Sequence, residues 1–116
     1  MTASRLVPKL IFLALFGLPF FANAQKVFKV DYESQADLKV YIIDYESQAD
    51  LKVFWVDYSS QADEDGLWFP VDYESQADYK LFFVDYESQA DLKIFEVKYE
   101  SQAGWRNNSK SHLLRF

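Results

Sequence analysis

The chain has 116 residues, of which 50% are hydrophobic and 19% aromatic, with no cysteine and a formal net charge of −6. The lack of cysteine excludes disulfides and thiolate metal sites, although secreted chains of this size often rely on disulfides. The acidic balance argues against binding to nucleic acid and to anionic membrane surfaces, which attract clusters of Lys and Arg.

The first 24 residues have the features of a secretory signal peptide. Arg5 and Lys9 supply the positive charge, residues 10–21 are mostly apolar, and Ala22-Asn23-Ala24 is an A-x-A cleavage site. The apolar stretch is shorter than the roughly 20 residues that a membrane-spanning helix needs. The alternative reading is a buried N-terminal helix. We predict cleavage before Gln25 and a secreted or periplasmic protein.

Residues 25–104 consist of six near-identical units of about 13 residues. Each contains the string Tyr-Glu-Ser-Gln-Ala, with Ser in place of Glu in the third unit. The units are 25–37, 38–50, 51–63, 64–78, 79–91 and 92–104, and their tyrosines are Tyr32, Tyr45, Tyr58, Tyr73, Tyr86 and Tyr99. Such repetition indicates that one small structural unit is used six times.

Each unit begins with strand-forming residues and ends with turn-forming residues. The first part, Leu-Lys-Val-Phe-x-Val-Asp-Tyr, is rich in β-branched and aromatic residues. The Glu-Ser-Gln-Ala-Asp that follows favours a turn or one helical turn. Since side chains alternate between the faces of a strand, we assign the face that carries Phe, Val and Tyr (Tyr41, Ile43 and Tyr45 in the second unit) to the core. The variable x position is expected to meet solvent in at least some units. Its residues are Lys29, Ile42, Trp55, Phe83 and Glu96, with Pro70 in the fourth unit.

The connections and the fourth unit carry further expectations. Five residues are too few for a conventional parallel crossover, so a hairpin meander is the first geometric expectation. In the fourth unit, Glu64-Asp65 is an insertion, and Pro70 predicts an edge, bulged or short strand because proline cannot donate to a ladder. Gly66 is expected to supply a turn conformation closed to other residues.

Repetition creates a problem of pairing, because similar strands can pair in several registers at similar energy. A device that closes the sheet, such as a ring, a barrel or an interlaced chain, is therefore expected. The lysine and the acids of each unit are interpreted as protection against aggregation between strand edges.

The tail, residues 105–116, differs from the units in charge. It carries three basic residues and no acid, whereas the six units carry 18 acids against seven lysines. We expect the tail to dock on the units and to fill one end of the core with Trp105, Leu113, Leu114 and Phe116. A frayed terminus is the alternative.

The repeat unit resembles a known family. The residues that carry the resemblance are Tyr-Glu-Ser-Gln-Ala-Asp-x-Lys-Val-Phe, the final copy that runs from Tyr99 to Asn107, and the Lys-x-His-Leu stretch at 110–113. They are similar to a family of small uncharacterised repeat proteins whose β-rich, pseudosymmetric monomer is tied in a deep seven-crossing torus knot. The resemblance covers residues 25–116 and implies strands wound around each other rather than a meander. The signal peptide and the insertion at 64–65 depart from that pattern.

The fold expected is therefore mainly β, with six pseudosymmetric strand-turn units in one closed, deeply knotted domain. The domains expected are a signal peptide at 1–24, the six-repeat domain at 25–104 and a basic tail at 105–116. We expect the molecule to be a monomer.

The chemistry-bearing residues favour no catalytic site. His112 is the only histidine, and the repeated serines fit structural turns better than a nucleophile used six times. Acids flank the tyrosines, and rings of their oxygens could bind a hard cation such as Ca²⁺, or the acids could pair with lysines between units. They are Asp31, Asp44, Asp57, Asp72 and Asp85 before the tyrosines, and Glu33, Glu46, Glu74, Glu87 and Glu100 after them. We expect no catalytic residue, no metal site and no cofactor, and the resembling family supplies no catalytic residues.

Two functions are kept as hypotheses beside a third, less favoured, enzymatic one. The first is an exported, non-enzymatic structural protein valued for resistance to proteolysis and mechanical unfolding. The second is a binding module in which aromatic side chains beside acids take a cationic protein or a glycan. Its candidate residues are Trp55, Phe69 and Phe83. Neither hypothesis involves nucleic acid, or a membrane once the signal is removed.

Overall fold

A computed structural model describes residues 25–114, so the predicted signal peptide and the last two residues lie outside the described part. Within it, no helix is long and apolar enough to span a bilayer. The strands are β1 (Lys26–Lys29), β2 (Leu38–Ile42), β3 (Leu51–Trp55), β4 (Leu67–Pro70), β5 (Tyr79–Phe83), β6 (Leu92–Glu96) and β7 (Gly104–Trp105). Short 3₁₀ turns separate them, namely η3 (Glu33–Gln35), η4 (Glu46–Gln48), η5 (Ser59–Gln61), η6 (Glu74–Gln76), η7 (Glu87–Gln89) and η8 (Glu100–Gln102), and a longer one, η9 (Asn108–Leu114), follows β7.

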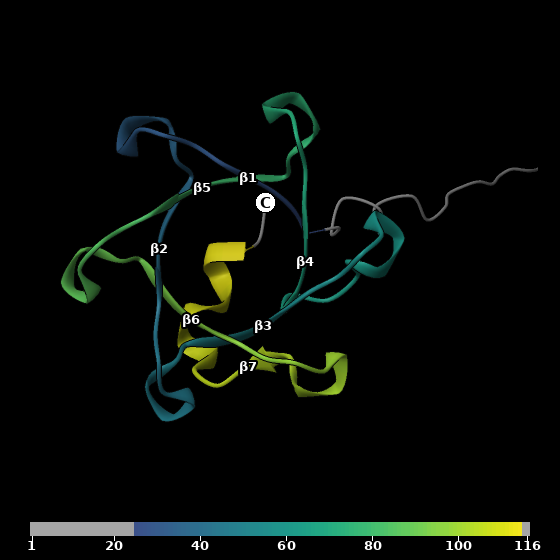
Figure 1. The fold of residues 1–116 in the computed structure, drawn as a ribbon. Helices are drawn as coiled ribbons and strands as arrows, with labels where there is room; N and C mark the ends of the chain where they lie inside the picture. Colours follow the sequence, from purple (N-terminus) through teal and green to yellow (C-terminus); the bar gives the residue numbers. More distant parts are fainter. Residues whose placement is uncertain (1–24, 115–116) are drawn as a thin grey trace, which may run out of the picture.

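Six of the strands close into a ring, which is seen end-on in Figure 1. The order around it is β4, β1, β5, β2, β6 and β3, and a further pairing between β3 and β4 closes it. Strands from the first half of the chain (β1 to β3) therefore alternate with strands from the second half (β4 to β6). The units are equivalent strand-turn modules in one closed, mainly β domain, as expected.

The expected hairpin meander is wrong, because all pairings within the ring are parallel and only β7 joins it in antiparallel fashion, on β3. Figure 1 shows why five-residue connections suffice. The strands run around the ring in one sense, and each connection only turns an outward corner. The chain then enters the next strand without retracing the length of the previous one, so it needs no conventional crossover.

A reciprocal pair of hydrogen bonds fixes which strands meet. The Asp37 amide donates to the Lys80 carbonyl oxygen (2.7 Å), and the Lys80 amide donates to Asp37 Oδ2 (2.8 Å). The same clamp joins Asp50 to Lys93, Asp78 to Lys26 and Asp91 to Lys39. Each clamp spans 43 or 52 residues of sequence. The last residue of a turn thus specifies a distant partner strand.

The lysine side chains have a different role from their backbones. Each of four ammonium groups lies within 4 Å of a glutamate in the preceding turn, in the pairs Lys39–Glu33, Lys52–Glu46, Lys80–Glu74 and Lys93–Glu87. Such exposed pairs contribute little to stability, typically about 0.2–1 kcal/mol. The repeat lysines of the four clamps therefore pair with aspartate through their backbone amides and not through their ammonium groups.

The face opposite the one that the repeat pattern indicated lines the inside of the ring, although one position of the indicated face is also buried, namely the Val or Ile after x (Val30, Ile43, Val56 and Val84). In the second unit, Leu38 and Val40 point into the ring and are buried, while Tyr45 is 67% exposed. The other five repeat tyrosines are equally exposed, at 66–68%. The residues that fill the ring are Val27, Leu38, Val40, Leu51, Val53, Trp68, Tyr79, Leu81, Leu92, Ile94 and Leu114. Assignment of the tyrosine to the core was wrong because the strand ends at x, and the tyrosine already belongs to the outward corner.

The fourth unit corrects two further expectations. β4 is a short strand, as expected, but it pairs on both sides and is therefore not an edge. The Phe69 amide donates to the Gln25 carbonyl oxygen, just before β1, and the Val71 amide donates to the Val27 carbonyl oxygen of β1, so Pro70 removes no bond from that ladder. Gly66 is needed for space and not for a positive φ, since a Cβ there would lie 2.6 Å from the Lys52 carbonyl oxygen.

The described part of the tail docks on the ring, as expected. Arg106 Nη1 donates to the Ser47 carbonyl oxygen (2.7 Å), and Lys110 Nζ lies 3.6 Å from the buried carboxylate of Asp50. Leu114 is buried in the core, and the Tyr79 hydroxyl donates to its carbonyl oxygen (2.6 Å). In Figure 1, η9 lies across the inside of the ring outline. Since Tyr79 begins β5, and Asp50 and Asp91 precede β3 and β6, η9 closes the end where the strands start.

Candidate functional site

The x position is the last residue of every ring strand. Since the ring strands are parallel, their last residues gather at one opening, opposite the end that η9 closes. These six residues are Lys29, Ile42, Trp55, Pro70, Phe83 and Glu96. All six line one pocket, which we call the mouth. The repeat therefore delivers its most variable position to a single place.

Strand alternation explains why these side chains point inward. Ile42 lies two residues after Val40 and four after Leu38, so the three share the inner face. Leu38 and Val40 are buried in the ring, whereas Ile42 is 41% exposed above them. Across the six units, the exposed fraction at x ranges from half-buried to exposed, which confirms the expectation that x meets solvent in at least some units.

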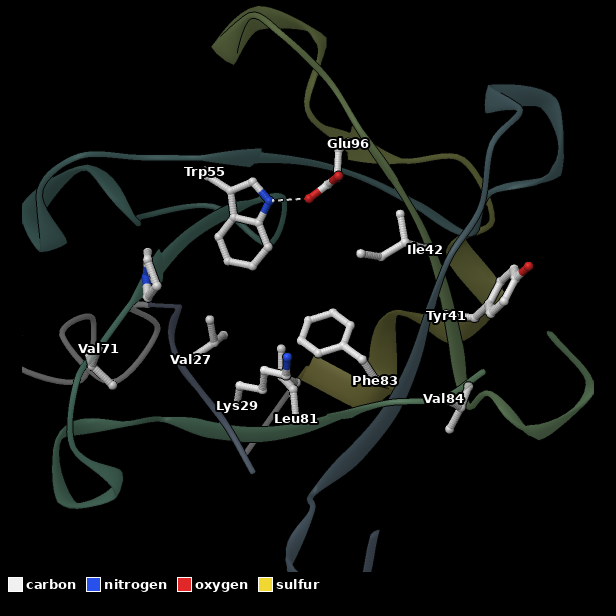
Figure 2. Close-up of a pocket in the computed structure, with 11 residues that line it drawn as sticks. Val27, Lys29, Tyr41, Ile42, Trp55, Val71, Leu81, Phe83, Val84 and Glu96 are labelled. Atoms are coloured by element: carbon white, nitrogen blue, oxygen red, sulfur yellow. Dashed lines mark hydrogen bonds between the residues drawn. The ribbon is translucent and has the colours of Figure 1, made fainter. Parts of the chain in front are cut away.

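The mouth is a concave space of about 520 Å³. Val27 and Leu81 of the core form part of its lining, together with the six x residues. Figure 2 shows Trp55, Ile42 and Phe83 pointing toward an open centre from different strands. A volume in this range, an apolar lining and a few polar groups are typical of small-molecule sites.

Two charged residues occupy opposite walls of the mouth. Lys29 ends β1 and Glu96 ends β6, and these strands are three places apart in a ring of six. Glu96 Oε2 accepts a hydrogen bond from Trp55 Nε1 (2.7 Å). The Lys29 ammonium lies 5.8 Å from the centre of the Phe83 ring. The mouth therefore has an indole and a carboxylate on one side, and a phenyl ring and an ammonium group on the other (Figure 2).

Trp55 contacts a second aromatic ring in addition to its hydrogen bond with Glu96. Its ring meets that of the buried Trp68 edge to face, with 5.7 Å between centroids. Such aromatic pairs add about 0.5–1.5 kcal/mol to simple burial. With the bond to Glu96, this contact fixes the orientation of the indole.

At the closed end, the hydroxyl of Tyr79 has a raised pKa. Burial, and then the negative charges of Asp65 and Asp78, raise the pKa of Tyr79 from 10.0 to about 12. The hydroxyl stays protonated and donates to the tail. The hydroxyl therefore helps to hold η9, which we call the plug because it closes this end of the ring.

The remaining candidate residues do not join the mouth. His112 is exposed on η9, at the closed end, with Nδ1 3.1 Å from the Ser109 carbonyl oxygen. The repeated serines and the acids beside the tyrosines are exposed on or next to the outward turns. Among residues 25–114, no three His, Cys, Asp or Glu side chains lie close enough to hold a metal ion.

The aromatic binding candidates separate into two places. Trp55 and Phe83 lie in the mouth, whereas Phe69 packs on a second small cluster formed by Val56, Ala62 and Leu67. The residues that sequence reasoning missed as part of a site are Lys29 and Glu96. Lys29 and Glu96 could have been found by treating the six x positions as one surface, because parallel strands bring equivalent positions to the same edge.

A family-model comparison identifies the chain. Residues 24–106 match the model of the 7(1) septoil knot domain. The match covers most of the chain, so the protein belongs to the septoil knot family, in agreement with the resemblance of its repeats. In the ring, strands from the first half of the chain alternate with strands from the second half. This order is consistent with a chain whose strands are wound around each other. No curated protein and no solved structure matches the chain.

Proposed function

We propose that this member of the septoil knot family is a non-enzymatic binding module whose ligand site is the mouth of the ring. One observation carries the proposal. Six strand-end positions, the most variable of an otherwise nearly uniform repeat, surround one pocket of about 520 Å³. Elsewhere most units keep the same residue types, with exceptions such as Ser59, the insertion at 64–65 and Lys98, so the mouth is where the chain departs most from its own symmetry.

The mouth fits a small ligand better than a large partner. Trp55 and Phe83 are only half-buried, and they face the centre of the opening instead of forming a flat platform. A small molecule could contact both walls at once, whereas a glycan chain or a cationic protein would meet the rim. The groups present, which are two aromatic rings, one ammonium and one carboxylate, suit recognition and orientation.

The proposal is tested by chemical-shift mapping with a library of small neutral aromatic fragments. We expect some fragments to shift amide signals at the carboxyl ends of several ring strands together. Ile42→Trp should abolish these shifts because a larger side chain fills the mouth. The matched control is Tyr86→Trp, which changes an exposed corner outside it. If no fragment perturbs the mouth, or if the filled variant binds as well, the proposal is wrong.

A role based on durability is a second candidate, and it is compatible with export as a secreted or periplasmic protein. The alternating strand order and the four Asp–Lys clamps favour it, because strands from opposite halves of the chain must separate together. Slow unfolding in urea and survival in concentrated protease would support it. Rapid cleavage of the folded protein within residues 25–114 would refute it.

A further inference from the structure

We propose that the ligand of the mouth is a short peptide of two or three residues with free termini and apolar side chains. Its amino group binds at Glu96 and its carboxylate binds at Lys29. This inference rests on the proposed function, because it names the chemical class that the same site takes.

The first argument is the placement of charge. Lys29 and Glu96 face each other across the opening, from β1 and β6. A ligand that satisfies both must carry opposite charges at its two ends. A free α-amino acid holds its ammonium and carboxylate on one carbon, so it cannot reach opposite walls. An extended peptide separates its termini by about 3.3–3.6 Å for each residue.

The second argument is that both charged groups are available. Glu96 uses Oε2 for Trp55, and no other group among residues 25–114 forms a hydrogen bond or ion pair with Oε1. The Lys29 ammonium contacts the Phe83 ring and forms no ion pair with any residue of the described part of the chain. Lysines at the repeat position behave differently, since four of them pair with glutamates. Lys29 and Glu96 therefore offer a cation and a carboxylate oxygen to an incoming molecule.

The third argument is the character of the space between them. Trp55, Phe83 and Ile42 project into it, and Val27 and Leu81 contribute to its lining. These surfaces favour aliphatic and aromatic side chains over polar ones. A simple lipid or hydrocarbon would satisfy the walls but would leave the ammonium and the carboxylate without partners. A short apolar peptide satisfies both sets of groups.

The test is calorimetric titration of the full chain with the tripeptide Leu-Ala-Phe. Its N-acetyl form, which lacks the ammonium, and its C-terminal amide, which lacks the carboxylate, are the matched ligands. We expect each blocked form to bind about tenfold more weakly than the free peptide, as is usual for loss of a charged hydrogen bond. Equal affinity of the three forms would overturn the inference.

Variants of the protein identify which wall binds which end. Glu96→Gln keeps an acceptor for the Trp55 indole, and it should weaken the free peptide about tenfold while leaving the N-acetyl form unchanged. Lys29→Met should weaken the free peptide and leave the amide unchanged. Lys98→Met and Glu100→Gln, which alter exposed residues outside the mouth, should bind like the original chain. If either mouth variant weakens all three ligands equally, the assignment of the termini is wrong.

The fragment experiment separates this inference from the proposed function. If neutral fragments bind in the mouth but none of the three peptides does, the peptide inference falls and the binding function stands. If neither fragments nor peptides bind there, both fall.

Discussion

Gly66→Ala should destabilise the protein by an amount that the geometry around Gly66 sets. A Cβ at this position would lie 2.6 Å from the Lys52 carbonyl oxygen, 2.7 Å from the Gly104 amide nitrogen and 3.1 Å from the Ala103 Cβ. The first two are backbone atoms of β3 and of β7, which pair with each other at Lys52 and Gly104. Because no rotamer change can relieve such a contact, one of these segments must move.

The cost combines overpacking with a weakened strand pairing. Overpacking in a close-packed site typically costs about 1–3 kcal/mol, and a backbone hydrogen bond contributes about 1 kcal/mol net. We therefore expect Gly66→Ala to lower the free energy of unfolding by roughly 2–4 kcal/mol. Urea unfolding, followed by tryptophan fluorescence until the signal no longer drifts, measures this difference.

Gly104→Ala is the matched control, because nothing lies within 4 Å of a Cβ there. Gly104 has a φ of 141°, a conformation that favours glycine, so its substitution should cost about 1–3 kcal/mol through the backbone alone. Only the Gly66 variant should also loosen β7, seen as faster amide exchange at the β3–β7 pairing. A Gly66→Ala chain within about 0.5 kcal/mol of the original would refute the steric argument.

Three further predictions address the plug, the clamps and the core. Tyr79→Phe removes a buried donor to the tail and should cost about 1–3 kcal/mol. Because the pKa of Tyr79 is raised to about 12, the folded chain keeps a proton that the unfolded chain loses above pH 10. Stability should therefore fall as the pH rises from about 10 to about 12. Urea midpoints across this range should fall less in Tyr79→Phe than in the original chain. Asp50→Ala removes a buried carboxylate that binds a backbone amide and an ammonium group, so it should lower the free energy of unfolding by about 3 kcal/mol. The exposed Asp37→Ala should lower it by about 1 kcal/mol. Equal urea midpoints for the two variants would contradict the expected difference between the buried and the exposed clamp. Tyr86→Ala should change the free energy of unfolding by less than about 0.5 kcal/mol. Leu92→Ala, at a fully buried position, should lower it by about 2–5 kcal/mol. A large loss of stability in Tyr86→Ala would show that the face with the repeat tyrosines belongs to the core.

The sequence was sufficient to predict the elements and their closure. The six strand-turn units and the docking of the tail followed from the repeat and from charge. Strand order did not follow, because equivalent strands carry no local signal of which partner to choose. That choice depends on contacts such as the one between Asp37 and Lys80, which are 43 residues apart.

The face of the strand was misread for a physical reason. Tyr45 is as regularly apolar as Leu38, and periodicity cannot tell a residue at the end of a strand from one at its centre. The mouth was missed because the x residues were judged one at a time. Lys29 and Glu96 look unrelated along the chain and become a facing pair only when the ring is closed.

The alternating strand order has a consequence for how the molecule is made. During synthesis, β1, β2 and β3 emerge without any neighbour, because their partners in the sheet begin only with β4 at Leu67. The nascent first half must therefore wait as open chain while the ribosome completes the second half. Closure of the ring can begin only once the later strands are available to pair.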